Sequence, residues 1–286
     1  MDWLFVPFAD PAMARALAAC VALAFGGAPI GVFLVLRRTS LIGDALSHAI
    51  LPGVAIAFVF AGFSILWMTI GGLAAGMAVA ILSAAASRMT ALREDASLAA
   101  FFIISLALGT LLVATFGTDD ELLHILFGKV LAMPDEALLT VAGVATATMA
   151  ALALLYRPLV LECFDPGFLR SAGRTGAFVH FAFLSLVVLN LVSGFQALGT
   201  LMAVGLMMLP AVSARFWSDH AGGQITVAVG VTIVAGFVGL IVAHHAGTPP
   251  ETTIVLTAGV FYLVSLIAGP RGGIAGRLVR LRHLEA

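Results

Sequence analysis

Residues 37–53 read Arg37-Arg38-Thr39-Ser40-Leu41-Ile42-Gly43-Asp44-Ala45-Leu46-Ser47-His48-Ala49-Ile50-Leu51-Pro52-Gly53. The stretch opens a run of about twenty mostly apolar residues, which is long enough for a helix to cross a bilayer. Lipid tolerates neither an acid nor a histidine well, so their presence in such a run indicates a specific role. The rest of the sequence is interpreted outward from this stretch.

Asp44 and His48 are four residues apart, so on a helix their side chains lie on one face with Cβ atoms roughly 5–6 Å apart. Ser40 and Ser47 fall on the same stripe, which we therefore expect to be polar. The remaining positions are apolar and cover the other faces. The pair fits an ion path or a proton relay, and it also fits a structural hydrogen bond between helices.

Pro52 and Gly53 predict a bend in this helix. Pro52 has no N–H to donate to the carbonyl of His48, and Gly53 lets the backbone turn beside it. A carboxylate, an imidazole and a released carbonyl would then meet at one depth. Carboxylate and carbonyl oxygens suit manganese, and imidazole suits zinc or iron as well. We expect a transient site for a divalent cation here, with Pro52 and Gly53 as a hinge.

The composition indicates a membrane protein. The chain has 286 residues, of which 62% are hydrophobic and 10% charged, whereas soluble domains carry about 25% charged residues. We expect an all-α, polytopic integral membrane protein with about 8–9 transmembrane helices, forming one transmembrane domain over residues 1–286. The first apolar run is expected to be a spanning helix and not a cleavable signal. The candidate spans are 12–36, 40–61, 64–86, 98–116, 137–155, 176–192, 197–216, 225–243 and 252–269.

The basic residues predict the orientation of these spans. Of the 14 lysines and arginines, twelve fall on one side, and only Arg15 and Lys129 fall on the other. By the positive-inside rule the first side is cytoplasmic, which places the N-terminus outside and the C-terminus inside. Residues 117–136 are too short and too acidic to span, so we expect an outer helix at the membrane surface.

Small residues predict how the spans pack. Gly72 and Gly76 form a G-x-x-x-G pattern, which is typical of close helix contacts in membranes. Gly26, Gly27 and Pro29 interrupt the first span, so a broken helix is expected there.

Residues 156–175 form the one sizeable loop on the predicted inner side. Asp165 is suited to cap a helix, Pro166 to begin it and Gly173 to end it. A helix of about two turns follows, with Phe168 and Leu169 giving it an apolar side. An interfacial helix and a docking element for a partner protein are both compatible with this pattern.

Taken together, these motifs resemble the membrane permease subunits of ATP-binding-cassette (ABC) importers for zinc, manganese or iron, the ABC-3 family. The resemblance is densest over residues 31–55. It recurs in order along most of the chain, at Glu94-Asp95, Leu122-Leu123-His124-Ile125-Leu126-Phe127-Gly128, Phe164-Asp165-Pro166, Gln196-Ala197-Leu198-Gly199 and Leu209-Pro210-Ala211-Val212-Ser213-Ala214-Arg215.

The resemblance implies roles for individual residues and partners. Asp44 and His48 match the family's metal-coordinating pair. The helix 166–172 matches its coupling helix, which inserts into the nucleotide-binding subunit. The family's permeases act as dimers in the cytoplasmic membrane with two ATPase subunits and an extracytoplasmic metal-binding protein. The metal is cargo, so no permanent cofactor is expected. The residues expected to contact the ATPase are Asp165, Pro166, Gly167, Phe168, Leu169 and Arg170.

The sequence departs from the family near the last span, where Thr248-Pro249-Pro250-Glu251-Thr252-Thr253 replaces the usual Pro, small residue, Gly and Pro. Glu251 adds an acid at the outer end, close in the predicted topology to His244 and His245. The three could form an outer mouth that receives metal, or they could simply be solvated.

Several other functions fit the sequence less well. The sole lysine, Lys129, follows Gly128 but precedes Val130, so there is no P-loop, and the ATPase must be a separate chain. The chain is therefore expected to be a translocation subunit and not an enzyme, with lipid around it and no nucleic-acid partner. The alternative is a proton-coupled secondary transporter using the Asp44–His48 pair, although no second copy of that block is found.

Isolated histidine and cysteine residues add no further site. An intramembrane metalloenzyme would need a further strong ligand and a general base, which no motif provides. His180 is alone in its span and is expected to bond to a neighbouring helix. Cys20 and Cys163 support neither a disulfide nor a thiolate zinc site.

Overall fold

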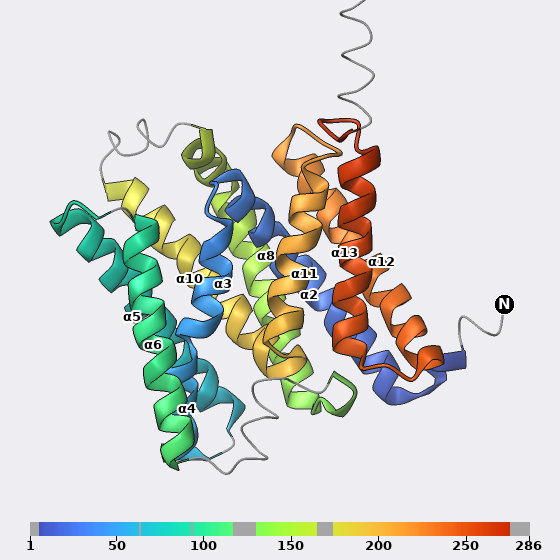
Figure 1. Ribbon diagram of the computed structural model, residues 1–286, viewed down its shortest axis with the longest axis horizontal. Coiled ribbons are helices and arrows are strands. Elements are labelled where there is room, and N and C mark those ends of the chain that lie inside the picture. The colour runs from blue at the N-terminus through green and yellow to red at the C-terminus, as the bar shows by residue number, and fades with distance from the viewer. Residues whose placement is uncertain (1–5, 63, 93, 117–129, 165–173, 275–286) are drawn as a thin grey trace, which may run out of the picture.

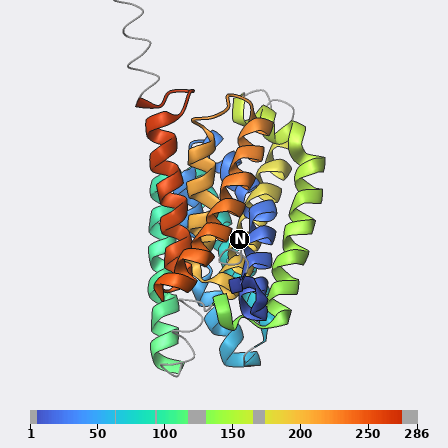
Figure 2. The ribbon, with the colours of Figure 1, turned by 90° about the vertical axis from the view of Figure 1, so that its right-hand side faces the viewer.

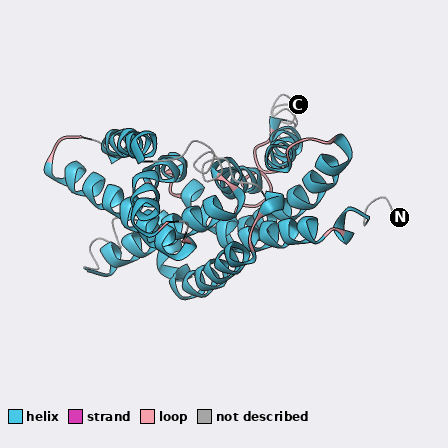
Figure 3. Ribbon diagram, turned by 90° about the horizontal axis from the view of Figure 1, so that it is seen from below, coloured by secondary structure: helices cyan, strands magenta, loops and turns pink. Residues whose placement is uncertain are grey.

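A computed structural model describes residues 6–62, 64–92, 94–116, 130–164 and 174–274. Within these ranges all the regular elements are helices, as Figure 3 shows. The all-α prediction is confirmed. Much of the segment 117–136, expected as an outer surface helix, lies outside the described residues, as does the predicted coupling helix 166–172.

The helices follow one another with short connections. Their bounds are η1 Val6–Ala9, α2 Pro11–Leu36, α3 Ser40–Ala49, α4 Leu51–Ala61, α5 Ile65–Met89, α6 Glu94–Phe116, η2 Val130–Ala132, α8 Asp135–Phe164, α10 Arg174–Leu198, α11 Thr200–Ala214, α12 Ala221–Ala246 and α13 Pro250–Ala268. Asp10 caps α2 by accepting a hydrogen bond from the Ala12 N–H at 2.9 Å, which satisfies one of the donors left free at a helix start.

Each of the nine predicted spans corresponds to helix. In the described part of the chain, seven helical segments are long and apolar enough to cross a membrane: Pro11–Leu36, Ser40–Ala61, Ile65–Ser87, Asp135–Cys163, Phe178–Leu198, Ala221–Ala246 and Pro250–Ala268. Ala96–Leu112 and Thr200–Ala214 are shorter apolar helices. The predicted number of spans therefore agrees roughly with the structure.

The helices form a bundle in which α2 is central. Figure 1 places α5 and α6 at one end of the molecule and α12 and α13 at the other. α2 contacts α8, α10, α11 and α12, and Figure 2 shows α8 and α13 on opposite sides of the bundle with α2 between them. The span formed by α3 and α4 packs against α5 and α6. This packing fixes the position of the helix that carries Asp44 and His48.

The predicted break in the first span is wrong, because α2 is continuous from Pro11 to Leu36 with Pro29 inside it. The small residues serve packing instead. A Cβ on Gly26 would lie 2.6 Å from Asn190 Oδ1, and one on Gly31 would collide with the carbonyl oxygen of Met207. Close contacts with α10 and α11 thus hold the helix together across the missing Pro29 hydrogen bond.

The packing role predicted for Gly72 and Gly76 is confirmed. A Cβ on Gly76 would lie 2.6 Å from Val188 Cγ1, and one on Gly72 would lie 3.0 Å from Val192 Cγ2. Both glycines therefore let α5 approach α10 closely, as the G-x-x-x-G pattern indicates.

The second span is interrupted at Ile50, between α3 and α4. The interruption lies two residues before Pro52, which occupies the first turn of α4, where a proline costs no hydrogen bond. Gly53 has a different task from the bending predicted for it. A Cβ there would collide with the backbone of Gly71 on α5, so Gly53 lets two helices cross at backbone contact.

We expect Gly53→Ala to destabilise the protein by about 1–3 kcal/mol, because the added methyl group must push α4 away from α5. The free energy of unfolding in mixed detergent micelles measures this loss. Gly143→Ala is the matched control, because a Cβ on Gly143 meets no atom within 4 Å. Equal stability of the two variants would contradict the close crossing at Gly53.

Candidate functional site

Asp44 and His48 lie one turn apart on α3 and face the same way. His48 Nε2 is 4.0 Å from Asp44 Oδ1, and the two side chains are 38% and 65% exposed. Phe102 of α6 borders the histidine, with ring centroids 6.5 Å apart. Leu41, one turn before Asp44, is 80% exposed. An acid, a histidine and a leucine therefore share an uncovered face within an apolar span.

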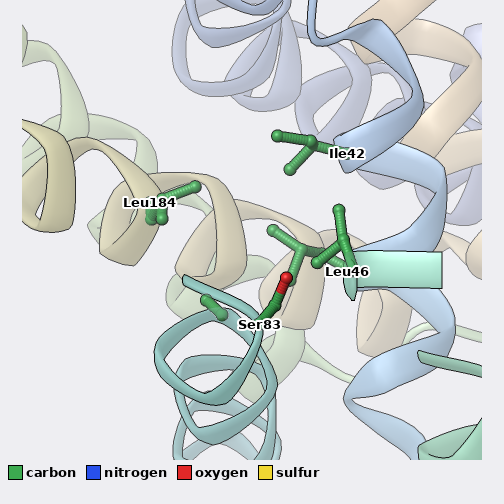
Figure 4. A pocket seen from close by; sticks show the side chains of 6 residues that line it. Ile42, Leu46, Ser83 and Leu184 are labelled. Carbon is green, nitrogen blue, oxygen red and sulfur yellow. The ribbon is translucent and has the colours of Figure 1, made fainter. Parts of the chain in front are cut away.

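The opposite face of α3 is packed against the bundle. Ile42 and Leu46 point into a small, mostly apolar cavity that α5, α6 and α10 complete (Figure 4). The cavity is lined by Ile42, Leu46, Ala80, Ser83, Leu98 and Leu184. Because the apolar face is anchored in this way, Asp44 and His48 are turned outward.

Ser40 and Ser47 were expected on the polar stripe, and the structure agrees only for Ser40. Ser40 is exposed, whereas Ser47 is buried. The Ser47 hydroxyl donates a hydrogen bond of 2.7 Å to the Asp44 carbonyl oxygen. A serine can satisfy its hydroxyl on its own helix in this way and be buried without another partner, which the helical spacing alone does not reveal.

The carbonyls at the break beside His48 are occupied. The Ile50 N–H is directed at the His48 carbonyl oxygen, which Pro52 leaves without its usual donor. Ser105 of α6 donates its hydroxyl to the Ala49 carbonyl oxygen at 2.9 Å. A hydroxyl from another helix thus stabilises the interrupted backbone next to the site.

Ser105→Ala is expected to lower the free energy of unfolding by about 1 kcal/mol, because the buried Ala49 carbonyl loses its donor from α6. Denaturation in mixed micelles measures the change. Thr110→Ala on the same helix is the control, because the Thr110 hydroxyl bonds within its own helix to the Ala107 carbonyl oxygen. A Ser105 variant no weaker than this control would contradict the role of the hydroxyl.

The pair is the whole ligand set that this region offers. Among the described residues no group of three histidine, cysteine, aspartate or glutamate side chains lies close enough to hold a metal ion. Asp44 and His48 therefore supply two ligand side chains, and water or another chain must complete a coordination sphere of four to six ligands.

The three residues considered for an outer mouth are engaged separately. The Glu251 carboxylate accepts a hydrogen bond of 2.8 Å from the Val130 N–H. His245 Nδ1 is 2.8 Å from the Ile241 carbonyl oxygen, and the rings of His244 and His245 meet edge to face with centroids 5.3 Å apart. In this arrangement Glu251 ties the start of α13 to η2, and a metal-receiving role stays a prediction.

The other polar groups inside the bundle join helices. His180 Nδ1 lies 3.4 Å from Glu162 Oε1 of α8, so the expected bond to a neighbouring helix is confirmed. Asn190 donates to Thr148 Oγ1 at 2.7 Å, also across helices. Cys20 and Cys163 are free, as predicted.

One buried ion pair was missed by sequence reasoning. Arg37 Nη2 lies 2.6 Å from Glu162 Oε2. Arg37 had been counted only among the basic residues that set orientation, and Glu162 had drawn no attention. Their opposite charges at the same predicted membrane depth were the available signal.

The residues expected to contact an ATPase, from Asp165 to Arg170, lie outside the described residues. Their role stays a prediction. The segments on either side of them are described, and both belong to long helices, α8 and α10.

Comparisons with known proteins place this geometry in a family. Residues 9–269 match the ABC 3 transport family. The manganese import system permease protein ScaB of Streptococcus parasanguinis is 31% identical over 257 residues, which cover 90% of each chain. The chelated iron transport system membrane protein YfeD of Yersinia pestis is 31% identical over 261 residues, covering 91% of this chain and 86% of YfeD.

A solved structure has the same fold over nearly the full length. It is described as PsaBC from Streptococcus pneumoniae in complex with Fab, and the matching chain has a TM-score of 0.85 and 27% sequence identity. The match covers 98% of this chain and 99% of the other. Since the family match spans nine helices and the interrupted Asp44–His48 span, the chain belongs to the ABC 3 transport family of membrane permeases.

Proposed function

We propose that the chain is the permease through which an ABC importer moves a divalent transition-metal ion into the cytoplasm. The observation that carries the proposal is the Asp44–His48 pair, exposed on α3 within an apolar span. A carboxylate and an imidazole bind manganese, iron and zinc. The permeases of manganese and chelated-iron systems at about 30% identity make manganese and iron the first ions to test.

A second copy of the chain is part of this proposal. Asp44 is 65% exposed in the single chain, and a carboxylate facing lipid is costly. A symmetric dimer would cover this face with the same face of its partner. Each copy would then contribute Asp44 and His48 to a common path, so that four side chains could replace part of the ion's water shell.

The remaining partners follow from the same proposal. A separate ATPase subunit would dock on the inner side through Asp165–Arg170, and an extracytoplasmic binding protein would deliver the ion. The chain would lie in the cytoplasmic membrane with its N-terminus outside and its C-terminus inside. Three observations support the side assigned to the coupling segment: α2 ends at Leu36 beside Arg37 and Arg38, α8 ends at Phe164, and Figure 1 shows both ends toward the same end of the bundle.

Movement of the ion would follow from a change at the α3–α4 interruption. The backbone is already broken at Ile50, and Ser105 holds the free Ala49 carbonyl. Closure of the ATPases would shift the inner ends of α8 and α10 and tilt α3. The Asp44–His48 pair would then part from its partners and release the ion inward.

Uptake in cells that lack their own importers tests the function. The chain, expressed with its candidate ATPase and binding protein, is expected to import radiolabelled manganese or iron only when the ATPase is intact. Dissipating the proton gradient at constant ATP is expected to leave uptake unchanged. Uptake that persists without the ATPase but stops with the proton gradient would refute the proposal and favour a proton-coupled transporter.

A further inference from the structure

A buried ionic cluster lies where three helices meet. Arg37 caps the end of α2, Glu162 lies in the last turn of α8, and His180 lies in the second turn of α10. The Glu162 carboxylate bridges the other two: Oε2 is 2.6 Å from Arg37 Nη2, and Oε1 is 3.4 Å from His180 Nδ1. One acid thus joins three helices that are far apart in sequence.

The cluster is well enclosed. The side chains of Arg37 and Glu162 are only 9% and 15% exposed. The Arg37 guanidinium also lies over the Phe183 ring, with Cζ 4.1 Å from the centroid, which is a favourable cation–π position. Burying such a pair costs desolvation, so a buried ion pair is poor evidence for stability and better explained by a need to fix one arrangement.

The three residues flank the segment that the proposed function assigns to the ATPase. Glu162 lies two residues before the end of α8, and His180 lies in α10, which begins at Arg174. The segment 165–173 connects these two helices. The carboxylate of Glu162 therefore ties together both stems of that segment.

The third member connects these stems to the metal-binding helix. Arg38, next to Arg37, has a left-handed conformation with φ 59°. The Arg38 N–H donates to the Val35 carbonyl oxygen at 3.1 Å, and the Thr39 N–H donates to the Leu34 carbonyl oxygen at 3.0 Å. These two bonds form a Schellman turn. Since α3 begins at Ser40, a displacement of Arg37 is carried through a tight turn to the helix of Asp44.

We propose that Arg37, Glu162 and His180 are positioning residues that transmit movement between the 165–173 segment and α3. Their bonds make the inner ends of α2, α8 and α10 move as one unit. The inference rests on the proposed function, because it assumes that an ATPase drives the 165–173 segment. It adds to that function the contact by which the driving force reaches Asp44 and His48.

The test uses the complete transporter in liposomes and measures manganese uptake and ATP hydrolysis in the same sample. Glu162→Gln keeps the size of the side chain and removes its charge. We expect the variant to co-purify with the ATPase and to bind manganese as the wild type does. Its uptake per ATP hydrolysed should fall about tenfold. A merely structural role would reduce the amount of folded transporter and leave this ratio unchanged.

Two further sets of variants make the result specific. Asp135→Asn removes the partner of Arg15, an exposed ion pair of 2.9 Å at the opposite end of α8, and should behave as wild type. Exchanging the charges with Arg37→Glu and Glu162→Arg should recover part of the lost ratio. Should Glu162→Gln fail to accumulate, Arg37→Lys and His180→Gln preserve more of the cluster and should each lower the ratio by a smaller factor.

The outcomes separate the inference from the proposed function. If the wild type imports manganese at the expense of ATP but the variants of Arg37, Glu162 and His180 keep its uptake per ATP, the inference is overturned and the function stands. If the wild type itself imports no metal with an active ATPase, the function fails first.

Discussion

Asp44→Asn is expected to reduce ATP-dependent metal uptake by at least about 100-fold while leaving the protein folded. Loss of groups that only orient a metal ligand costs 10–100-fold, so loss of a ligand itself should cost no less. Asparagine keeps the shape of the side chain but removes the negative charge that attracts a divalent cation. His48→Ala removes the imidazole and should have a similar effect.

Folding should survive these changes for a physical reason. Asp44 is exposed, and its nearest ionic contact is His48 at 4.0 Å, so the substitution breaks no tight interaction. Removing a charge from an apolar span also lowers the cost of membrane insertion. Uptake of radiolabelled manganese, normalised to the amount of transporter in the membrane, separates transport from folding.

Matched substitutions at exposed positions serve as controls. Asp10→Asn keeps an effective cap on α2, because asparagine caps helices as well as aspartate does, and His220→Ala alters an exposed residue before α12. Both should transport normally. If Asp44→Asn and His48→Ala also transported normally at wild-type abundance, Asp44 and His48 would not be the metal ligands.

The spans and the Asp44–His48 pair could be predicted from the sequence because both depend on local patterns. An apolar run of about twenty residues has one stable solution in lipid, a helix. A spacing of four residues places two side chains on one face whatever surrounds them. Exposure of the pair depends in addition on the packing of Ile42 and Leu46 on the other face of α3.

The errors arose where tertiary contacts outweigh local preference. Pro29 is tolerated within α2 because the small residues beside it let α10 and α11 approach closely. Gly53 would suit a bend, yet it lies at backbone contact with Gly71. The Arg37–Glu162 ion pair joins residues 125 positions apart. No local pattern pairs such residues, and only the fold brings them together.

A dimer of one wild-type copy and one Asp44→Asn copy provides the second large effect. The single chain offers two ligands, and the described residues contain no third. If the two copies share one site, every ion must pass the altered copy. Uptake by the mixed dimer should then fall to below about one tenth of the wild-type rate, because a shared site loses a ligand.

Two different affinity tags, one on each copy, allow the mixed dimer to be purified in sequence and reconstituted with the ATPase. Independent sites in the two copies would leave about half of the wild-type rate, which would contradict a shared site. A mixed dimer carrying Asp10→Asn in one copy is the control and should transport fully. Failure to isolate any doubly tagged complex would remove the second copy from the proposal, and Asp44 would then need another chain to cover its exposed face within the membrane.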